Sequence, residues 1–227
     1  MLVKNWMSKN VVTVDGESTI VEAMKLMKEH QIKRLPVTKK GKLAGIITDG
    51  DIKKASPSEA TTLEAHELAY LISSLKVKTI MTSPVVTVAS NRSIVEAAEE
   101  LMSNKVTGAP VLDDKENIVG MISMTDLTKL LITLTGVGPW GIEMGLLVKD
   151  EPGSIQALAD VIRSHGGRVR SLLTLYENVP EGFRKVFFRI YEFDRQKLTS
   201  LKNELGKKAR LLYLVDHLQA TREIYDN

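Results

Sequence analysis

The sequence contains no cysteine among its 227 residues. This absence excludes a disulfide framework, a thiol nucleophile and a thiolate metal site, and it is compatible with a reducing compartment. The four histidines do not have the short spacing of a metal-ligand pair. We therefore expect neither a metal site nor a cofactor.

An excess of one charge and a long uninterrupted apolar run are also missing. The 31 basic and 28 acidic residues leave a net charge of +3, which indicates neither a nucleic acid nor a membrane as partner. The first five residues lack the pattern of a signal peptide. The apolar stretch from Leu130 to Val148 is interrupted by glycines and by Pro139, which favours a linker and a buried strand over a membrane span. These features predict a cytoplasmic protein.

The motifs of common catalytic sites are absent as well. The sequence has no Gly-x-Ser-x-Gly elbow and no Gly-Lys-Ser/Thr phosphate loop. Residues 136–141 match Gly-x-Gly-x-x-Gly, but a strand-like run follows them where a dinucleotide site needs a helix. Without a nucleophile–base pair or a metal set, we expect that the chain is not an enzyme.

An internal repeat organises the first part of the chain. Residues 7–37 align with residues 81–111 at a constant offset of 74, and eleven of these 31 positions are identical. After one inserted residue in the second copy, residues 45–51 align with residues 120–126 at an offset of 75. Two copies of this length predict two similar structural units.

Both copies predict the element order β-α-β-β-α. The first helix of each copy follows a hydroxyl side chain that can cap it, Ser18 or Thr19 in one copy and Ser93 in the other. A second helix begins at Thr48 or Ser123. The predicted strands are Val11–Val14, Arg34–Thr38 and Leu43–Ile47, and then Val85–Val88, Ala109–Leu112 and Ile118–Ile122.

The repeated segment Gly-x-x-Thr/Ser-x-x-Asp has the chemistry of a phosphate and ribose site. Thr48 stands where a strand passes into a helix, and the free N–H groups and partial positive charge of a helix N-terminus can hold a phosphate. Asp51 lies about one turn further on, where its carboxylate could accept two hydrogen bonds from a ribose diol. Ser123 and Asp126 repeat this arrangement.

A capping box is the alternative interpretation, because Ser/Thr-x-x-acid also closes a helix end without any ligand. Two features favour the nucleotide interpretation. The motif occurs twice within long matching repeats, and a capping box does not require the upstream glycines, Gly45 and Gly120.

With these motifs, both repeats resemble CBS domains, which pack in pairs as Bateman modules. The resemblance covers about residues 1–133 and implies that Asp51 and Asp126 bind a ribose, and that Thr48 and Ser123 bind a phosphate. It implies AMP, ADP, ATP or S-adenosylmethionine as regulatory ligand. The residues implied to surround the base are Thr13 together with the run 32–36, which includes Pro36, and Thr87 together with the run 106–110, which includes Thr107 and Pro110.

The two copies differ where charge would affect a phosphate. Lys33 and Arg34 stand in the first copy where the second has Thr107 and Gly108. Basic side chains can bind a phosphate chain, so the first motif is expected to suit a phosphorylated ligand better. The alternative is a solvated pair of charges before a strand.

The last third of the chain predicts a different unit with the order β-α-β-β-α-β, which is ferredoxin-like. Asp150-Glu151-Pro152-Gly153-Ser154 forms the turn into its first helix, which ends at Gly166-Gly167. The predicted strands are Ile142–Val148, Arg168–Tyr176, Arg184–Glu192 and Arg210–Val215, with a second helix near Arg195–Leu205.

This unit resembles an ACT domain, in which amino acids bind at the loop before the first helix, usually across a dimer interface. The resemblance rests on Asp150, Pro152, Gly153 and Ser154, and ordinary helix-start chemistry is the alternative. The order CBS–CBS–ACT resembles the acetoin-utilisation B-type family. We therefore expect an α/β (α+β) protein that forms a homodimer.

The expected boundaries are 1–56 and 76–133 for the repeats, 57–75 for a connector helix, 134–141 for a linker, 142–216 for the ACT-like domain and 217–227 for a tail. The leading hypothesis is a regulatory sensor of adenosine-type ligands that acts on a partner protein. One alternative is an assembly scaffold without a ligand, and a second is an amino-acid sensor that uses the ACT-like domain.

Overall fold

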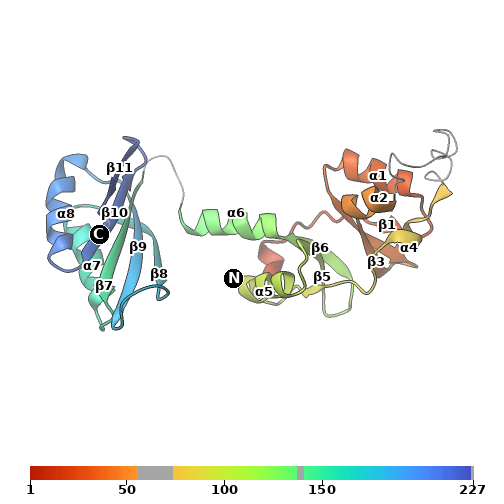
Figure 1. Ribbon diagram of the computed structural model, residues 1–227, viewed down its shortest axis with the longest axis horizontal. Helices are drawn as coiled ribbons and strands as arrows, with labels where there is room; N and C mark the ends of the chain where they lie inside the picture. The colour runs from red at the N-terminus through yellow and green to blue at the C-terminus, as the bar shows by residue number, and fades with distance from the viewer. Residues whose placement is uncertain (56–73, 137–140, 226–227) are drawn as a thin grey trace. The chain divides into compact units, whose positions relative to one another are not determined.

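The computed structural model describes residues 1–55, 74–136 and 141–225 (Figure 1). The chain divides into two compact units, Met1–Thr128 and Lys129–Asn227. Most of the predicted connector, residues 57–75, lies outside the described residues. Within the described residues, no helix has both the length and the apolar character that a membrane crossing requires.

The first repeat forms a three-stranded sheet with the order β1-β2-β3. β1 is parallel to β2, and β2 is antiparallel to β3. Thr19 caps the first helix in a full capping box with Glu22, which confirms one of the two predicted caps. The elements are β1 (Val14–Asp15), α1 (Ile20–Glu29), β2 (Arg34–Lys39), β3 (Lys42–Thr48) and α2 (Asp49–Ala55).

The second repeat has the same topology, with the sheet order β4-β5-β6. Val14 pairs with Val37 in the first repeat and Val88 pairs with Val111 in the second, so the register is conserved as well. The predicted order β-α-β-β-α and the cap at Ser93 are confirmed. The elements are β4 (Val88–Ala89), α5 (Ile94–Ser103), β5 (Gly108–Leu112), β6 (Ile118–Ser123) and α6 (Met124–Leu134).

Each repeat is preceded in the sequence by a short segment that packs against the other repeat, and we call these two the exchanged segments. The 3-10 helix η1 (Val3–Asn5) precedes the first repeat but binds the second, where the Val3 N–H donates to the Arg92 carbonyl at 2.9 Å. The helix α4 (Val77–Ile80) precedes the second repeat but binds the first, where the Val77 N–H donates to the Ser18 carbonyl at 2.9 Å. The two repeats are therefore interleaved along the chain.

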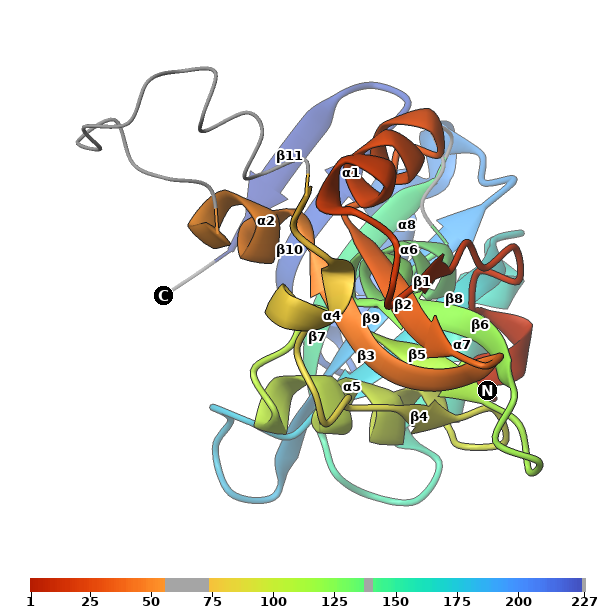
Figure 2. The ribbon, with the colours of Figure 1, turned by 90° about the vertical axis from the view of Figure 1, so that its right-hand side faces the viewer.

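The core of the first repeat lies between its helices and its sheet. Figure 2 shows α1 and α2 beside β2 and β3, with α4 next to β3. Each apolar side chain buried in this way contributes about 1.5–3 kcal/mol. The buried side chains are Val14, Ile20, Ala23, Met27, Leu35, Val37, Ile47, Ile52 and Val77.

The C-terminal unit is a five-stranded sheet with the order β11-β10-β7-β9-β8. All neighbouring strands are antiparallel, and α7 and α8 lie on one face (Figure 1). The predicted β-α-β-β-α-β order is confirmed. The elements are β7 (Ile142–Lys149), α7 (Ser154–Ser164), β8 (Arg168–Leu175), β9 (Phe183–Tyr191), η2 (Arg195–Lys197), α8 (Leu198–Gly206), β10 (Arg210–Asp216) and β11 (Thr221–Ile224).

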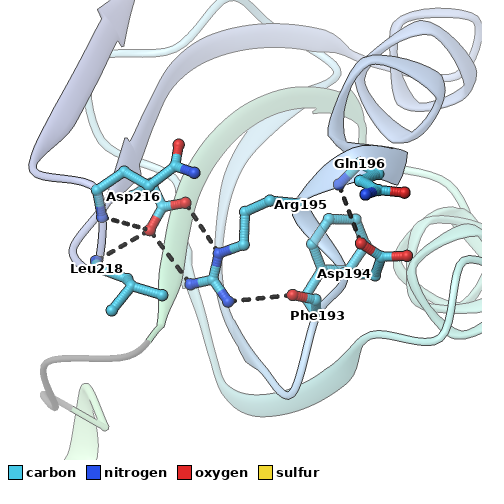
Figure 3. A network of polar contacts seen from close by, with 7 residues as sticks. Phe193, Asp194, Arg195, Gln196, Asp216 and Leu218 are labelled. Carbon is cyan, nitrogen blue, oxygen red and sulfur yellow. Dashed lines mark hydrogen bonds and ion pairs between the residues drawn. The ribbon is translucent and has the colours of Figure 1, made fainter.

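The strand β11 was not expected, because its residues fall in the predicted tail and have a single apolar side chain. An ion pair between a buried aspartate and a partly exposed arginine stabilises the turn that leads into it (Figure 3). Asp216 is fully buried and accepts hydrogen bonds from Arg195 Nε at 3.1 Å and from the Leu218 N–H at 2.9 Å. Local polar contacts thus position a strand that hydrophobic alternation does not reveal.

Candidate functional site

The first corner, formed by Thr48 and Asp51, is closed by three hydrogen bonds within the motif. The Thr48 N–H donates to Asp51 Oδ2 at 2.9 Å, and the Thr48 hydroxyl donates to the same oxygen at 2.7 Å. The Asp51 N–H donates back to Thr48 Oγ1 at 3.2 Å. This is the reciprocal geometry of a capping box. The motif therefore caps α2 in this structure.

The second corner, formed by Ser123 and Asp126, has the same geometry. Its three distances are 2.9, 2.6 and 3.3 Å in the same order. In both corners the residue before the helix is the last residue of a strand, so the helix begins one position later than the sequence predicted, at Asp49 and at Met124.

Capping leaves part of each corner available for a ligand. Among the described residues, Oδ1 of Asp51 and Oδ1 of Asp126 have no hydrogen-bond partner, so each can accept from a ribose hydroxyl. The Thr48 and Ser123 hydroxyls already donate their protons to a carboxylate. A phosphate could receive these protons only if the hydroxyls turned away from Asp51 and Asp126.

The motif glycines have a packing role. A Cβ atom on Gly45 would lie 2.3 Å from Met81 Sδ, and one on Gly120 would lie 2.3 Å from Met7 Sδ. Met81 lies just after α4 and Met7 just after η1, so both methionines adjoin the exchanged segments. The glycines are therefore required by the approach of these side chains. Contrary to the expectation from the sequence, their presence does not distinguish a nucleotide site from a capping box.

Arg34 extends from the first repeat to the second. Its Nη2 donates to Thr107 Oγ1 at 2.7 Å, and a Cβ atom on Gly108 would lie 2.3 Å from its Nη1. Burial lowers the pKa of Arg34, and the carboxylates of Asp49 and Asp126 partly offset this effect. This location differs from the sequence-based expectation, in which Lys33 and Arg34 support the first corner alone.

The residues expected around the base occupy different environments. Pro36 and Pro110 are buried at matching positions of β2 and β5. Thr13 and Thr107 are exposed, and Thr87 is half-buried. Their role around a base stays a prediction.

The predicted ACT loop is bound by Arg184, a residue that no motif in the sequence marks. Arg184 Nη2 donates to Ser154 Oγ at 3.0 Å, and its Nε lies 3.3 Å from Asp150 Oδ1 in an ion pair. Gly153 has a φ of +84°, which favours glycine at this turn. Pro152 is exposed. The alternation of β9 places Arg184 on the same side as Val186 and Phe188, and this pattern could have identified it.

A polar cluster occupies the other face of the C-terminal sheet. Glu143 is bound by Arg189, accepts from the Tyr213 hydroxyl at 2.8 Å and lies 3.5 Å from His217 Nε2. Burial would raise the pKa of Glu143, but these partners outweigh it and hold the pKa below its ordinary value. In the described part of the chain, no group of three His, Asp or Glu side chains is arranged to hold a metal ion.

Comparisons with known proteins concern the part of the chain that carries the two corners. The profile of the CBS domain family matches residues 3–58 and 77–133. A CBS domain-containing protein of Dictyostelium discoideum is 37% identical over 133 residues, which cover 58% of this chain and 92% of that protein. The profile match includes both Gly-x-x-Thr/Ser-x-x-Asp motifs.

Two further proteins are similar over nearly the same share of the chain, 57% and 58%. The L-aspartate semialdehyde sulfurtransferase of Methanocaldococcus jannaschii is 32% identical over 130 residues, which are 57% of this chain and 23% of that enzyme. The solved CBS domain pair of protein MJ0100, in complex with 5′-methylthioadenosine and S-adenosyl-L-methionine, is 30% identical. It has a TM-score of 0.48 and covers 58% of this chain and 95% of that chain.

Proposed function

This chain belongs to the CBS domain family, and from that premise we propose that it is a regulatory sensor of an adenosine-type ligand. The ligand, AMP, ADP, ATP or S-adenosylmethionine, binds at the two corners. Its binding changes the conformation or assembly of the protein and thereby the activity of a partner. The protein acts in the cytoplasm.

The observation that carries this proposal is the duplicated corner with one free acceptor. Each corner caps a helix with Oδ2 of its aspartate and leaves Oδ1 without a partner among the described residues. A cap alone would be complete with one carboxylate oxygen. A ribose diol supplies the hydroxyl donors that the second oxygen can accept.

The proposed role is regulation without catalysis by this chain. The similar sulfurtransferase is matched over 23% of its length, so its activity does not extend to this chain on that match. Binding that differs between two conformations is sufficient to shift their populations. A regulated partner can then respond to the ligand without any chemistry at the corners.

The C-terminal unit, which resembles an ACT domain, is proposed as a second sensor or as a dimer contact. Its edge strand β8 supports the second role. Four apolar side chains of β8 are each between 38% and 40% exposed, although β8 belongs to a regular sheet. Unpaired apolar edges are rare in isolated domains, because they pair readily with another strand. A homodimer joined along β8 would cover Val169, Leu172, Leu173 and Leu175.

The experiment that tests the proposal is a titration of the purified protein with AMP, ADP, ATP and S-adenosylmethionine, followed by calorimetry and by thermal unfolding. We expect saturable binding, and a ligand at 100 times its Kd should add about 2.7 kcal/mol to the stability of the N-terminal unit. Asp51→Ala should remove binding at the first corner, and the double variant with Asp126→Ala should remove it at both.

The matched control is Glu22→Ala, because Glu22 closes a capping box of the same kind on α1, outside both corners. This variant should slightly lower the unfolding temperature, because it opens one half of the capping box on α1, and it should keep the affinity for the ligand. Equal loss of affinity in Glu22→Ala and Asp51→Ala would show that the corners act only as structural caps. If none of the four ligands raised the unfolding temperature, the assembly scaffold would be the better hypothesis.

Amino acids belong in the same titration, because the alternative function assigns them to the C-terminal unit. Arg184 would be the residue to test, since it contacts both Asp150 and Ser154 of the loop. An amino acid that binds there should lose affinity in Arg184→Gln. Its affinity should not change in Asp51→Ala.

A further inference from the structure

The side chain of Arg34 breaks the symmetry between the two corners. Arg34 and Gly108 occupy equivalent positions of the two repeats, at the offset of 74. Arg34 donates to Thr107, the residue next to its own counterpart. The guanidinium group of Arg34 therefore lies over the start of β5. Gly108, at the equivalent position of the second repeat, has no side chain that could make the reciprocal contact with β2.

Gly108 provides the space for this contact. A Cβ atom there would lie 2.3 Å from Arg34 Nη1 and 2.9 Å from the Ile122 carbonyl oxygen. The close approach to Nη1 shows that the arginine side chain is packed directly against the backbone of the second repeat. Its location is fixed by packing as well as by the hydrogen bond to Thr107.

The charges around the two corners also differ. Asp49 begins the helix at the first corner, so two carboxylates, those of Asp49 and Asp51, lie within three residues. Met124 occupies the equivalent position at the second corner, where Asp126 is the single acidic residue of the first turn. The first corner therefore has one carboxylate more in the first turn of its helix than the second corner, and this carboxylate, Asp49, lies 3.6 Å from Lys53 in an ion pair.

We propose that Arg34 is a specificity-determining residue of the second corner, where it selects ligands that carry a phosphate group. The inference rests on the proposed function and names the corner that recognises the phosphate. The contact with Thr107 engages Nη2, and in the described part of the chain no other hydrogen bond is formed by this guanidinium. The remaining N–H donors are those that bind phosphate oxygens in a planar, charge-assisted arrangement.

The test measures AMP and adenosine binding by calorimetry in proteins that keep one corner each. Asp51→Asn leaves the second corner and Asp126→Asn leaves the first, and the asparagine oxygen can still accept the backbone N–H that each aspartate now accepts. Into each background we would introduce Arg34→Gln. In the Asp51→Asn protein, Arg34→Gln should weaken AMP binding about tenfold, the loss expected for a hydrogen bond to a charged group. Adenosine binding should change less than about twofold.

In the Asp126→Asn protein, Arg34→Gln should change AMP binding by less than about twofold. Lys33→Gln is the matched control, because Lys33 is the adjacent, exposed cation. It should leave AMP binding at the second corner unchanged. A second variant, Asp49→Asn, alters a half-exposed side chain and should strengthen AMP binding at the first corner about threefold by removing one negative charge.

The outcomes separate this proposal from the proposed function. If Arg34→Gln weakened AMP binding only in the Asp126→Asn protein, Arg34 would serve the first corner and the proposal would be overturned. Equal losses for AMP and adenosine would show a structural role without phosphate selection, and would overturn it as well. If the unmodified protein bound neither ligand, the proposed function itself would fail, and this proposal with it.

Discussion

At the scale of single residues, glycines determine which side chains can cross between the repeats. Gly45 and Gly120 each accept a methionine at a distance that no Cβ atom would allow, and Gly108 accepts Arg34 in the same way. None of these three glycines has a positive φ, so a left-handed backbone conformation does not explain why glycine occupies these positions. Their role is close approach, and it follows from contacts with segments that are distant in sequence.

The contact of Gly45 makes a prediction about stability. Gly45→Ala should lower the free energy of unfolding by about 1–3 kcal/mol, because the new methyl group overlaps the side chain of Met81. The double variant Gly45→Ala/Met81→Ala should show a smaller loss than the sum of its single variants, measured by urea unfolding. Gly50→Ala is the control, since its Cβ would meet nothing closer than Thr48 Oγ1 at 3.5 Å. Additive losses would contradict the overlap.

Asp216 makes a prediction about pH. Burial would raise its pKa, but the hydrogen bonds from Arg195 and from the N–H groups of Leu218 and Gln219 outweigh burial and hold the pKa below its ordinary value. Because the pKa in the folded state is the lower one, the carboxylate stabilises the fold above the unfolded pKa of about 3.9. This contribution disappears as the pH falls through the folded pKa.

We therefore expect the free energy of unfolding of the C-terminal unit to decrease below about pH 4. Urea unfolding at intervals of about half a pH unit, from about pH 2.5 to about pH 7, measures this decrease. Asp216→Asn should cost about 2 kcal/mol at neutral pH, since Arg195 loses its carboxylate partner. It should also flatten the pH dependence. A variant with the unmodified slope would show that other carboxylates cause the acid sensitivity.

At the scale of elements, the exchanged segments explain why the repeat begins earlier than the alignment of residues 7–37 suggests. Val3-Lys4 and Val77-Lys78 match at the same offset of 74, and Val3 and Val77 are both fully buried. This short match was the available signal in the sequence. Two residues in isolation carry little information about which sheet they will cover, so this match does not predict the exchange.

The exchange predicts where each truncation acts. Val3→Ala and Val77→Ala should each cost about 2 kcal/mol, because each removes two methyl groups from a fully buried side chain. In hydrogen–deuterium exchange, Val3→Ala should accelerate exchange in α5 and β6, whereas Val77→Ala should accelerate it in α1 and β3. The two variants control for each other. Faster exchange of α1 in the Val3→Ala protein would contradict the exchange of segments.

At the scale of the whole molecule, the proposed homodimer depends on β8. Leu173→Lys places a charge on the exposed edge and should lower the affinity of the dimer at least about tenfold, since charged edge residues oppose strand pairing. Sedimentation at several concentrations measures this change. Leu218→Lys, which alters an exposed leucine in a turn outside β8, should leave the association unchanged. A monomer for the unmodified protein would exclude the β8 interface.

Local patterns in the sequence are enough to predict the two repeats, the order of their elements, the ferredoxin-like order of the C-terminal unit and the caps at Thr19 and Ser93. These features depend on local periodicity and on side-chain contacts over three or four residues, which a sequence displays directly. The corner motifs belong to the same class, because Thr48 and Asp51 are three residues apart.

Tertiary packing sets what the corners contact. It placed Met7 and Met81 against the motif glycines, Arg34 against the opposite repeat and Arg184 against the predicted ACT loop. It also added β11, which polar contacts of Asp216 stabilise. Each of these contacts joins residues that become neighbours when sheets and helices pack. The physical reason is that a hydrophobic pattern specifies which face of an element is buried, whereas the partner of that face is chosen by the packing of the whole unit.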